Sequence, residues 1–277
     1  MNGYNCHADN LLEFIRQSNL SFDAICISET SLMNEQKIAN ESRIEGFKDP
    51  FTTNSTSCRG GVAIFTKQYL DATEREDLKI QTHEFEAVWT EINNKGSKNT
   101  VIGSIYRHPH SNNLDEFHKY ISKCLTILSK QNKDVYIAGD FNIDLLRYEK
   151  DTKFKEFYNL MSSYGYLPLI IQPTRITDTT HSLIDNIYTN CIGNECQSGN
   201  VLIEMADHLT QFASITKQES YNVPGKNQYK RDTKKWDEKS FLDDLSIQRW
   251  ETSSNDVNKQ FDDLLFKFEG CVDRHLP

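Results

Sequence analysis

The sequence predicts a layered α/β or α+β domain, because short β-branched runs recur along the chain and helical patterns lie between them. Several of these runs are nearly continuous apolar stretches, which are typical of strands covered on both faces. The runs lie at residues 23–28, 61–66, 87–92, 100–106, 134–139, 184–189 and 211–216. Periodicity alone does not choose between the α/β and α+β classes.

Three segments of the first 217 residues predict helices. Residues 114–128 place apolar side chains at intervals of three and four, which gives one apolar helix face. Residues 154–161 follow the same rule, and Gly165 stands where such a helix would end. Residues 11–15 indicate a further helix ahead of the first clear strand.

The 277-residue chain is long enough for one large domain, expected at residues 1–217, and an appendage at residues 218–277. Residues 218–239 are polar and contain Pro224, Gly225 and several Lys and Arg residues, so they predict a linker. Two helical patterns follow, and the second places Val257, Phe261 and Leu264 on one stripe. A tail this short cannot build its own core, so we expect it to dock on something or to belong to a longer parent protein.

Composition and charge limit the classes of function. The formal net charge of −9 counts against a simple electrostatic nucleic-acid binder and suits carboxylates gathered around a divalent cation. Seven scattered cysteines without zinc-type spacing are typical of a reducing compartment. Residues 1–10 lack a signal-peptide core, and no apolar run approaches the ~20 residues that cross a bilayer. We therefore expect an intracellular protein, nuclear or cytoplasmic, without a membrane partner.

Carboxylates follow two of the apolar strands. The run 134–139 leads directly into Asp140 and Asn142, at the strand end where layered α/β folds often bind ligands. Asp140 can hold an attacking water and Asn142 can donate to a phosphate oxygen, although G-D-x-N is also turn-forming. Glu29 ends the run 23–28 and is a candidate Mg²⁺ ligand, or simply a strand end or helix cap.

The dipeptide Asp207–His208 precedes the last strand-like run. It can supply a general acid or base, or a cation for a phosphorane transition state, although a structural histidine is the alternative. Asp185 lies inside a strand-like run, where a carboxylate needs a partner. The imidazole of His208 would suit, because Asp185 would fix its tautomer and favour its charged form. Backbone amides are the other candidate partners.

Further polar residues are candidates for binding a phosphate-containing substrate. Tyr106 ends the run 100–106 and can donate to a phosphate oxygen, and Arg107 beside it can hold the DNA backbone. A core tyrosine with its hydroxyl at the rim is the alternative. Thr174 and Ser182 are weaker candidates of the same type.

Taken in order, the motifs E-T, G-G-V-A-I-F, I-Y-R-x-P, G-D-F-N, S-L-I-D-N-I and D-H-L resemble the endonuclease/exonuclease/phosphatase superfamily. Residues 173–190 resemble more narrowly the endonuclease domains of LINE-type (non-LTR) retrotransposons, and the tail resembles the segment ahead of their reverse transcriptase. The resemblance spans residues 11–216. It implies a deoxyribonuclease I-like, four-layer sandwich of two mainly antiparallel β-sheets flanked by helices.

The resemblance also implies roles around a metal ion, Mg²⁺ with Mn²⁺ as an alternative. Glu29 would be a metal ligand, and Asp207 would help to hold the metal or the leaving group. Asp140 would orient or deprotonate the nucleophilic water. His208, oriented by Asp185, would stabilise the pentavalent phosphorus.

The remaining roles concern the substrate, which the resemblance implies is DNA. Tyr106 and Asn142 would bind the scissile phosphate, with Thr174 and Ser182 as secondary contacts. The expected reaction is a nick that leaves a 3′-hydroxyl to prime reverse transcription. An AP-site nuclease or phosphatase of the same superfamily is one alternative, and a catalytically decayed retrotransposon fragment is another. The sequence does not indicate an oligomeric state.

The N-terminus departs from the family pattern. The family carries an asparagine on a first strand nearly thirty residues before the glutamate, and Asn2 has that spacing without an apolar strand around it. We therefore expect the first strand to be missing, which would expose a sheet edge. Ala206 stands where the family usually has serine.

Overall fold

The computed structural model describes residues 4–18, 20–31, 43–53, 60–109, 113–191, 195–203, 207–216, 237–251 and 256–275. The chain divides into two compact units, Met1–Gln218 and Glu219–Pro277. The candidate site residues named above all fall in the first unit.

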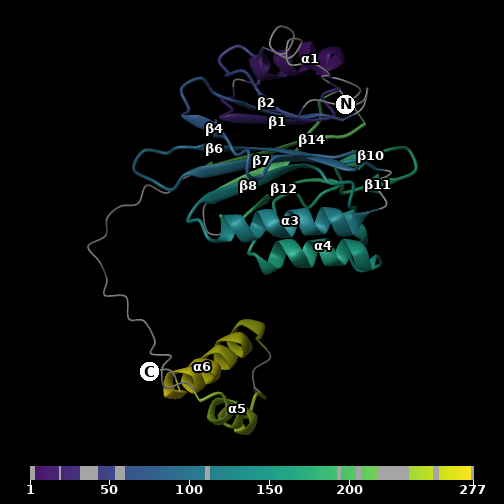
Figure 1. The fold of residues 1–277 in the computed structure, drawn as a ribbon. Helices are drawn as coiled ribbons and strands as arrows, with labels where there is room; N and C mark the ends of the chain where they lie inside the picture. The colour runs from purple at the N-terminus through teal and green to yellow at the C-terminus, as the bar shows by residue number, and fades with distance from the viewer. Residues whose placement is uncertain are drawn as a thin grey trace. The chain divides into compact units, whose positions relative to one another are not determined.

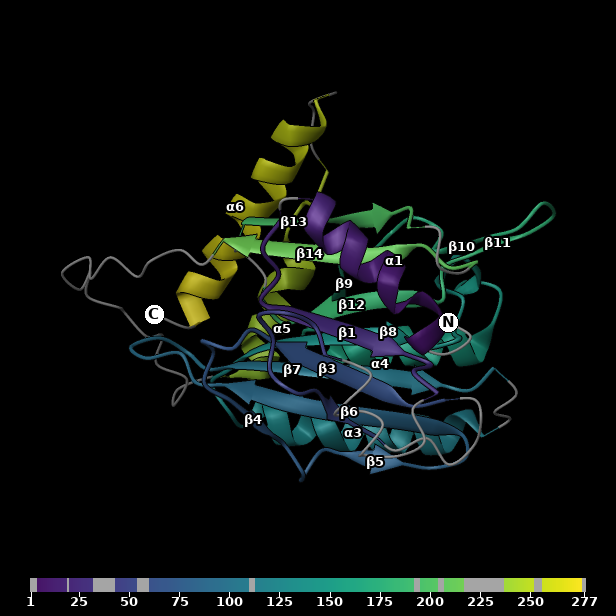
Figure 2. The same ribbon diagram turned by 90° about the horizontal axis from the view of Figure 1, so that it is seen from above.

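Four layers make up the first unit (Figures 1 and 2). Helix α1 (Tyr4–Gln17) packs on a three-stranded sheet with the order β1-β3-β2. A seven-stranded sheet lies beneath it, and α3 (Leu114–Ser129) and α4 (Thr152–Ser163) cover the far face of that sheet. The predicted fold class and the predicted layered sandwich of sheets flanked by helices are confirmed.

The smaller sheet consists of β1 (Ala24–Ser28), β2 (Phe51–Thr52) and β3 (Val62–Thr66). The larger sheet has the order β4-β6-β7-β8-β12-β9, with β5 paired to β6. Its strands are β4 (Ala72–Glu74), β5 (Ile80–Gln81), β6 (Phe85–Ile92), β7 (Thr100–Arg107), β8 (Asp134–Asp140), β9 (Leu167–Pro168) and β12 (Asp185–Thr189). Among the strand pairs of the described residues, β7–β8 is parallel and the others are antiparallel.

Two short ribbons and a helical turn complete this unit. The ribbons are β10 (Arg175–Ile176) with β11 (His181–Ser182), and β13 (Glu195–Val201) with β14 (Thr210–Thr216). The 3₁₀ turn spans Leu145–Arg147. Within the described residues β1 pairs with β3 alone, so it is an edge strand there. Asn2 and Ala206, on which the N-terminal and serine predictions depend, lie outside the described residues.

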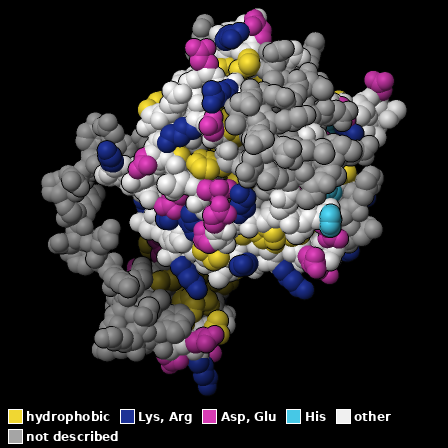
Figure 3. Space-filling model, turned by 45° about the horizontal axis from the view of Figure 1, so that its top comes forward, with side chains coloured by type: hydrophobic (Ala, Val, Ile, Leu, Met, Phe, Trp, Pro, Cys, Tyr) yellow, Lys and Arg dark blue, Asp and Glu magenta, His cyan; other side chains and the backbone are white. Residues whose placement is uncertain are grey.

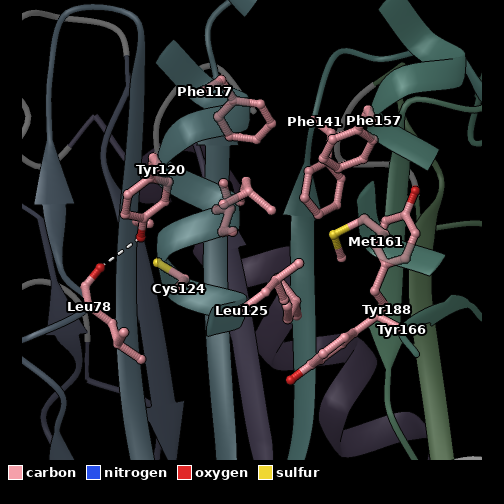
Figure 4. Close-up of a cluster of buried hydrophobic side chains, with 14 of the residues drawn as sticks. Leu78, Phe117, Tyr120, Cys124, Leu125, Phe141, Phe157, Met161, Tyr166 and Tyr188 are labelled. Atoms are coloured by element: carbon pink, nitrogen blue, oxygen red, sulfur yellow. Dashed lines mark hydrogen bonds between the residues drawn. The ribbon is translucent and has the colours of Figure 1, made fainter. Parts of the chain in front are cut away.

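Helix α3 shows how the predicted apolar stripe organises the core. Asn113 caps the helix by accepting a hydrogen bond from the Glu116 amide. The buried stripe packs against the larger sheet and α4, and Figure 4 shows aromatic and aliphatic side chains from these elements pointing toward one another. Tyr120 stays satisfied there because its hydroxyl donates to the Leu78 carbonyl at 2.7 Å and accepts from Trp89 at 2.8 Å. This core is the rigid base beneath the strand ends that carry the polar residues.

The second unit contains α5 (Glu238–Ile247) and α6 (Val257–His275). Arg274 donates to Asp244 at 2.9 Å, and the rings of Phe241 and Phe268 meet edge to face, so the two helices contact each other. Much of the predicted linker lies outside the described residues. No helix among those described combines the length and apolar character that crossing a bilayer requires.

Candidate active site

Four polar side chains form one row across the larger sheet. Glu86 on β6 is the Cα partner of Tyr106 on β7, Tyr106 is the partner of Asp140 on β8, and Asp140 is the partner of Asp185 on β12. Directly opposed residues on neighbouring strands present their side chains on the same face. The strand register therefore brings together three of the predicted site residues.

Close packing of the β8 backbone against β7 helps to fix the position of these polar side chains. A Cβ on Gly139 would lie 1.9 Å from the carbonyl oxygen of Ile105 on β7. Only glycine permits that approach, so β8 packs closely against β7 one residue before Asp140.

Asp185 and His208 form a pair at one end of the row. The Nδ1 atom of His208 lies 2.9 Å from one carboxylate oxygen of Asp185 and 3.1 Å from the other. Burial by itself would lower the pKa of His208, but the hydrogen bond and charge of Asp185 outweigh burial, so the pKa is raised. The pairing anticipated from the sequence is thus present, and it favours an imidazolium in the site.

Asp140 stands beside this pair. Ligand atoms of Asp140, Asp185 and His208 all lie within 4.8 Å of one another. Burial and the charge of Asp185 raise the pKa of Asp140, and Glu29 is close enough to add to the effect. The Asn142 amide donates to Asp140 Oδ1 at 3.0 Å. Buried carboxylates that repel one another suit a divalent cation that prefers oxygen ligands, so the residues present fit such an ion.

Glu29 reaches the site from the other sheet, directly after β1. The Tyr106 hydroxyl donates a hydrogen bond to its carboxylate. Burial alone would raise the pKa of Glu29, but this hydrogen bond helps to lower it overall, so the carboxylate stays charged. Glu29 has a φ of 58° and Asn142 a φ of 48°, in the left-handed region that asparagine tolerates and glutamate seldom adopts, so the strain falls on Glu29. Such strain is typical of functional sites.

The loop that follows β8 is held by Arg107. This side chain is only 5% exposed, and its guanidinium donates to the carbonyls of Phe141 and Asn142, each at 2.7 Å. In return the Asn142 side-chain amide donates to the Arg107 carbonyl at 2.6 Å. Arg107 is predicted to hold the DNA backbone, and in the structure these two hydrogen bonds shape the loop.

The other predicted substrate contacts lie at the edge of the site. The Thr174 hydroxyl is fully buried and accepts hydrogen bonds from the amides of Ile184 at 3.2 Å and Asp185 at 3.1 Å. Thr174 therefore positions Asp185. Ser182 is half-buried on β11, opposite Arg175 on β10.

Asp207, which is predicted to help hold the metal or the leaving group, pairs with Arg175 in the structure. Its carboxylate accepts from Arg175 Nε at 2.8 Å and lies 2.7 Å from a terminal guanidinium nitrogen. Burial opposes but does not overcome the hydrogen bond from Arg175, so the pKa of Asp207 is lowered. The backbones of Arg175 and His208 also form an isolated antiparallel β-bridge, which helps to place His208.

Arg175 and Glu86 lie in this region, but their roles were not predicted from the sequence. Arg175 lies within the motif P-T-R-I-T, but its partner Asp207 is distant in sequence. Glu86 directly precedes the apolar run 87–92 and follows Phe85, and that position was the available signal for it. The site therefore extends one strand further along the sheet than the sequence indicated.

Comparison with known proteins identifies the family. The Endonuclease/Exonuclease/phosphatase family matches the chain over residues 1–193. The chain belongs to this family. The resemblance inferred from the ordered motifs is thereby confirmed. No curated protein matched the chain in the search.

Solved structures of the endonuclease/exonuclease/phosphatase family share the fold at low sequence identity. The endonuclease domain of TRAS1, a telomere-specific non-LTR retrotransposon, has 16% identity and a TM-score of 0.56, with 76% of this chain and 93% of that chain covered. The Xenopus laevis APE2 catalytic domain has 17% identity and a TM-score of 0.54, with 77% and 89% covered. A Bacteroides thetaiotaomicron mannosyl-6-phosphatase has 12% identity and a TM-score of 0.54, with 78% and 92% covered.

Proposed function

We propose that the chain is a divalent-metal-dependent phosphodiesterase that cleaves DNA with an activated water molecule. The observation that carries the proposal is the meeting of Asp140, the Asp185–His208 pair and the Glu29–Tyr106 pair at one end of two packed sheets. A general base, a cationic imidazole and a cluster of carboxylates are the groups that this hydrolysis needs.

Glu29 and the carboxylates of the Asp140 cluster would hold Mg²⁺ or Mn²⁺. When bound, the ion would draw charge from a phosphate oxygen and acidify a bound water. Positive charge there would also favour the ionised form of Asp140, which must be charged to accept a proton from the attacking water.

The protein groups divide the remaining work. His208, kept charged by Asp185, would face the negative charge that develops on the phosphorane oxygens. Tyr106 holds a hydroxyl proton, since burial and the Glu29 carboxylate raise its pKa. The hydroxyl donates this proton to Glu29, and it would turn to a phosphate oxygen when Glu29 holds the cation. The left-handed backbone at Asn142 would help to place its side-chain amide beside the same phosphate.

DNA is the proposed substrate because relatives by fold are described as a retrotransposon endonuclease domain and as the catalytic domain of APE2. The motif at residues 173–190 supports a nick that primes reverse transcription as the biological role. Figure 3 shows acidic and basic side chains interspersed on one face. With a net charge of −9, we expect weak non-specific binding and a substrate held mainly by contacts near the site.

A supercoiled-plasmid nicking assay with Mg²⁺ or EDTA tests the proposal. His208→Ala and Asp140→Asn should each abolish cleavage. Asp134→Asn is the matched control, because Asp134 stands at the opposite end of the same strand, β8. No EDTA-sensitive nicking by the folded protein would refute the activity.

Substrate choice is a separate question, because a mannosyl-6-phosphatase shares the fold. A panel of plain duplex, abasic duplex and phosphorylated small molecules separates a nicking endonuclease from an AP-site nuclease and a phosphatase. Preference for plain duplex supports the retrotransposon role. A folded protein that turns over none of the three would favour the decayed fragment.

A further inference from the structure

A buried carboxylate outside the predicted site connects the two sheets. Glu86 on β6 is 1% exposed. Its Oε2 atom accepts from the Thr53 hydroxyl at 2.7 Å and from the Gly61 amide at 2.8 Å. Thr53 follows β2 and Gly61 precedes β3, so both donors belong to the smaller sheet, whereas Glu86 belongs to the larger one.

The chain is shaped around this carboxylate. Gly60 and Gly61 have φ values of 105° and 86°, which favour glycine. A Cβ on Gly60 would lie 2.7 Å from Glu86 Oε1 and 3.1 Å from a ring carbon of His108. His108 Nε2 lies 3.7 Å from Glu86 Oε1, and its ring packs edge-on against Tyr106 with centroids 4.7 Å apart.

The same two glycines hold the segment that carries Glu29. The Gly61 carbonyl accepts from the Thr30 amide at 3.0 Å, and the Gly60 carbonyl accepts from the Ser31 amide at 2.8 Å. Contacts therefore run from Glu86 through the glycines to the residues that directly follow Glu29. The left-handed backbone of Glu29 is adjacent to this anchored segment.

The connection matters because the two halves of the site stand on different sheets. Glu29 directly follows β1 of the smaller sheet, and Tyr106 and Asp140 belong to the larger sheet. Apolar side chains such as Val62 and Val88 pack between the sheets, but apolar contact is non-directional. Hydrogen bonds to a carboxylate are strong and directional, so they can fix how the sheets are set against each other.

We propose that Glu86 is a positioning residue that holds Glu29 against Tyr106 and so sets the affinity of the site for its divalent cation. The inference rests on the proposed function in taking Glu29 as a metal ligand. Glu86 itself contacts backbone and side chains of the protein.

Titration calorimetry with Mn²⁺ on the full chain tests the first consequence. Glu86→Ala removes both accepted hydrogen bonds and should weaken Mn²⁺ binding by about tenfold or more, the range seen when groups that orient metal ligands are lost. Glu86→Gln can keep both bonds through its amide oxygen and should recover most of the affinity. Glu91→Ala is the control, because Glu91 lies at the far end of β6, paired with Arg75 and Lys133.

A second readout needs neither metal nor catalysis. The ζ-carbon NMR resonance of Tyr106, assigned with Tyr106→Phe, reports its hydrogen bond to Glu29. It should shift in metal-free Glu86→Ala and stay in place in Glu91→Ala. If Glu86→Ala does not fold, the Tyr106 resonance is measured in Thr53→Val instead. That substitution removes one of the two hydrogen-bond donors to Glu86 and should shift the resonance too.

A folded variant with unchanged Tyr106 resonance and wild-type Mn²⁺ affinity would overturn the inference. Failure of the proposed function is separable, because it appears as a wild-type protein that cleaves no substrate. The Tyr106 resonance still decides on Glu86 in that case.

Discussion

Asp140→Asn should stabilise the metal-free protein at neutral pH while removing the proposed general base. Asp140 is almost fully buried beside Asp185, and both effects disfavour its charged form. Asparagine has nearly the same shape and can still accept the hydrogen bond from the Asn142 amide. The substitution therefore removes the electrostatic cost and leaves the local geometry in place.

The size of the effect follows from the pKa. Burial and Asp185 raise the pKa of Asp140 from 3.8 to about 8. At pH 7 the unfolded chain has lost this proton and the folded chain keeps it. At about 1.4 kcal/mol per pH unit above 3.8, this difference costs at most ~4 kcal/mol of folding free energy. We expect Asp140→Asn to gain about 1–4 kcal/mol, since relaxation and hydration reduce the full value.

The sign of the pH dependence is fixed by the direction of the shift. Because the folded-state pKa of Asp140 is raised, its cost is absent below the unfolded value and grows as the pH rises toward the folded value. The stability difference between the variant and wild type should therefore vanish near pH 4 and widen by up to about 1.4 kcal/mol per unit above it. Urea unfolding in EDTA at pH 5, 6 and 7 measures this slope.

Magnesium should reduce the stability advantage of the variant over wild type. A ligand that binds only the folded state adds about 2.7 kcal/mol at a concentration of 100 Kd, and Asp140→Asn should gain less because its site has lost a carboxylate. A variant less stable than wild type in EDTA at pH 7 would refute the electrostatic reasoning. A stability difference that does not change with pH would refute it too.

Three further outcomes are expected. Asp185→Asn should lower the pKa of His208, so that cleavage is lost at a lower pH than in wild type, which a pH–rate profile would detect. Tyr106→Phe should lower kcat about 10²-fold with a small change in KM, because its hydroxyl serves the transition state; an equal loss in 1/KM would contradict this. Gly139→Ala should cost more than ~3 kcal/mol in urea unfolding because its Cβ meets the β7 backbone. Gly165→Ala has space around its Cβ and should cost about 1 kcal/mol for its positive φ alone.

The central residues of the site were predictable because local sequence marks them. Asp140 and Glu29 each end an apolar run, and Asp185 sits where an unpaired carboxylate would be costly. That cost predicts a partner, and His208 fills the role at 2.9 Å. A carboxylate at a strand end, or inside an apolar run, can be recognised in the sequence alone. These residues could therefore be predicted without knowing the register or the order of the strands.

Residues whose role depends on strand pairing, or on hydrogen bonds formed only in the fold, could not be predicted in this way. Glu86 becomes the neighbour of Tyr106 only through the pairing of β6 with β7. Arg107 and Thr174 have donors and acceptors that suit a phosphate, but the fold uses them on its own backbone. A side chain that can bind a ligand can equally satisfy a buried backbone group, and sequence chemistry does not separate the two.

The candidate site contains backbone angles and a buried charge that are unfavourable by themselves. The surrounding structure explains why the folded protein keeps them. Glu29 adopts left-handed backbone at a cost of about 1–2 kcal/mol, Asn142 adopts it at a smaller cost, and Asp140 is buried against a like charge. A free peptide would not hold these backbone conformations or keep this carboxylate buried. Each is flanked by a rigid element: Gly139 locks β8 onto β7, Arg107 holds the loop at Asn142, and the glycines beside Glu86 anchor the residues after Glu29. Because these anchors act on the backbone, the polar side chains are held in place for the phosphate and the cation of the proposed function.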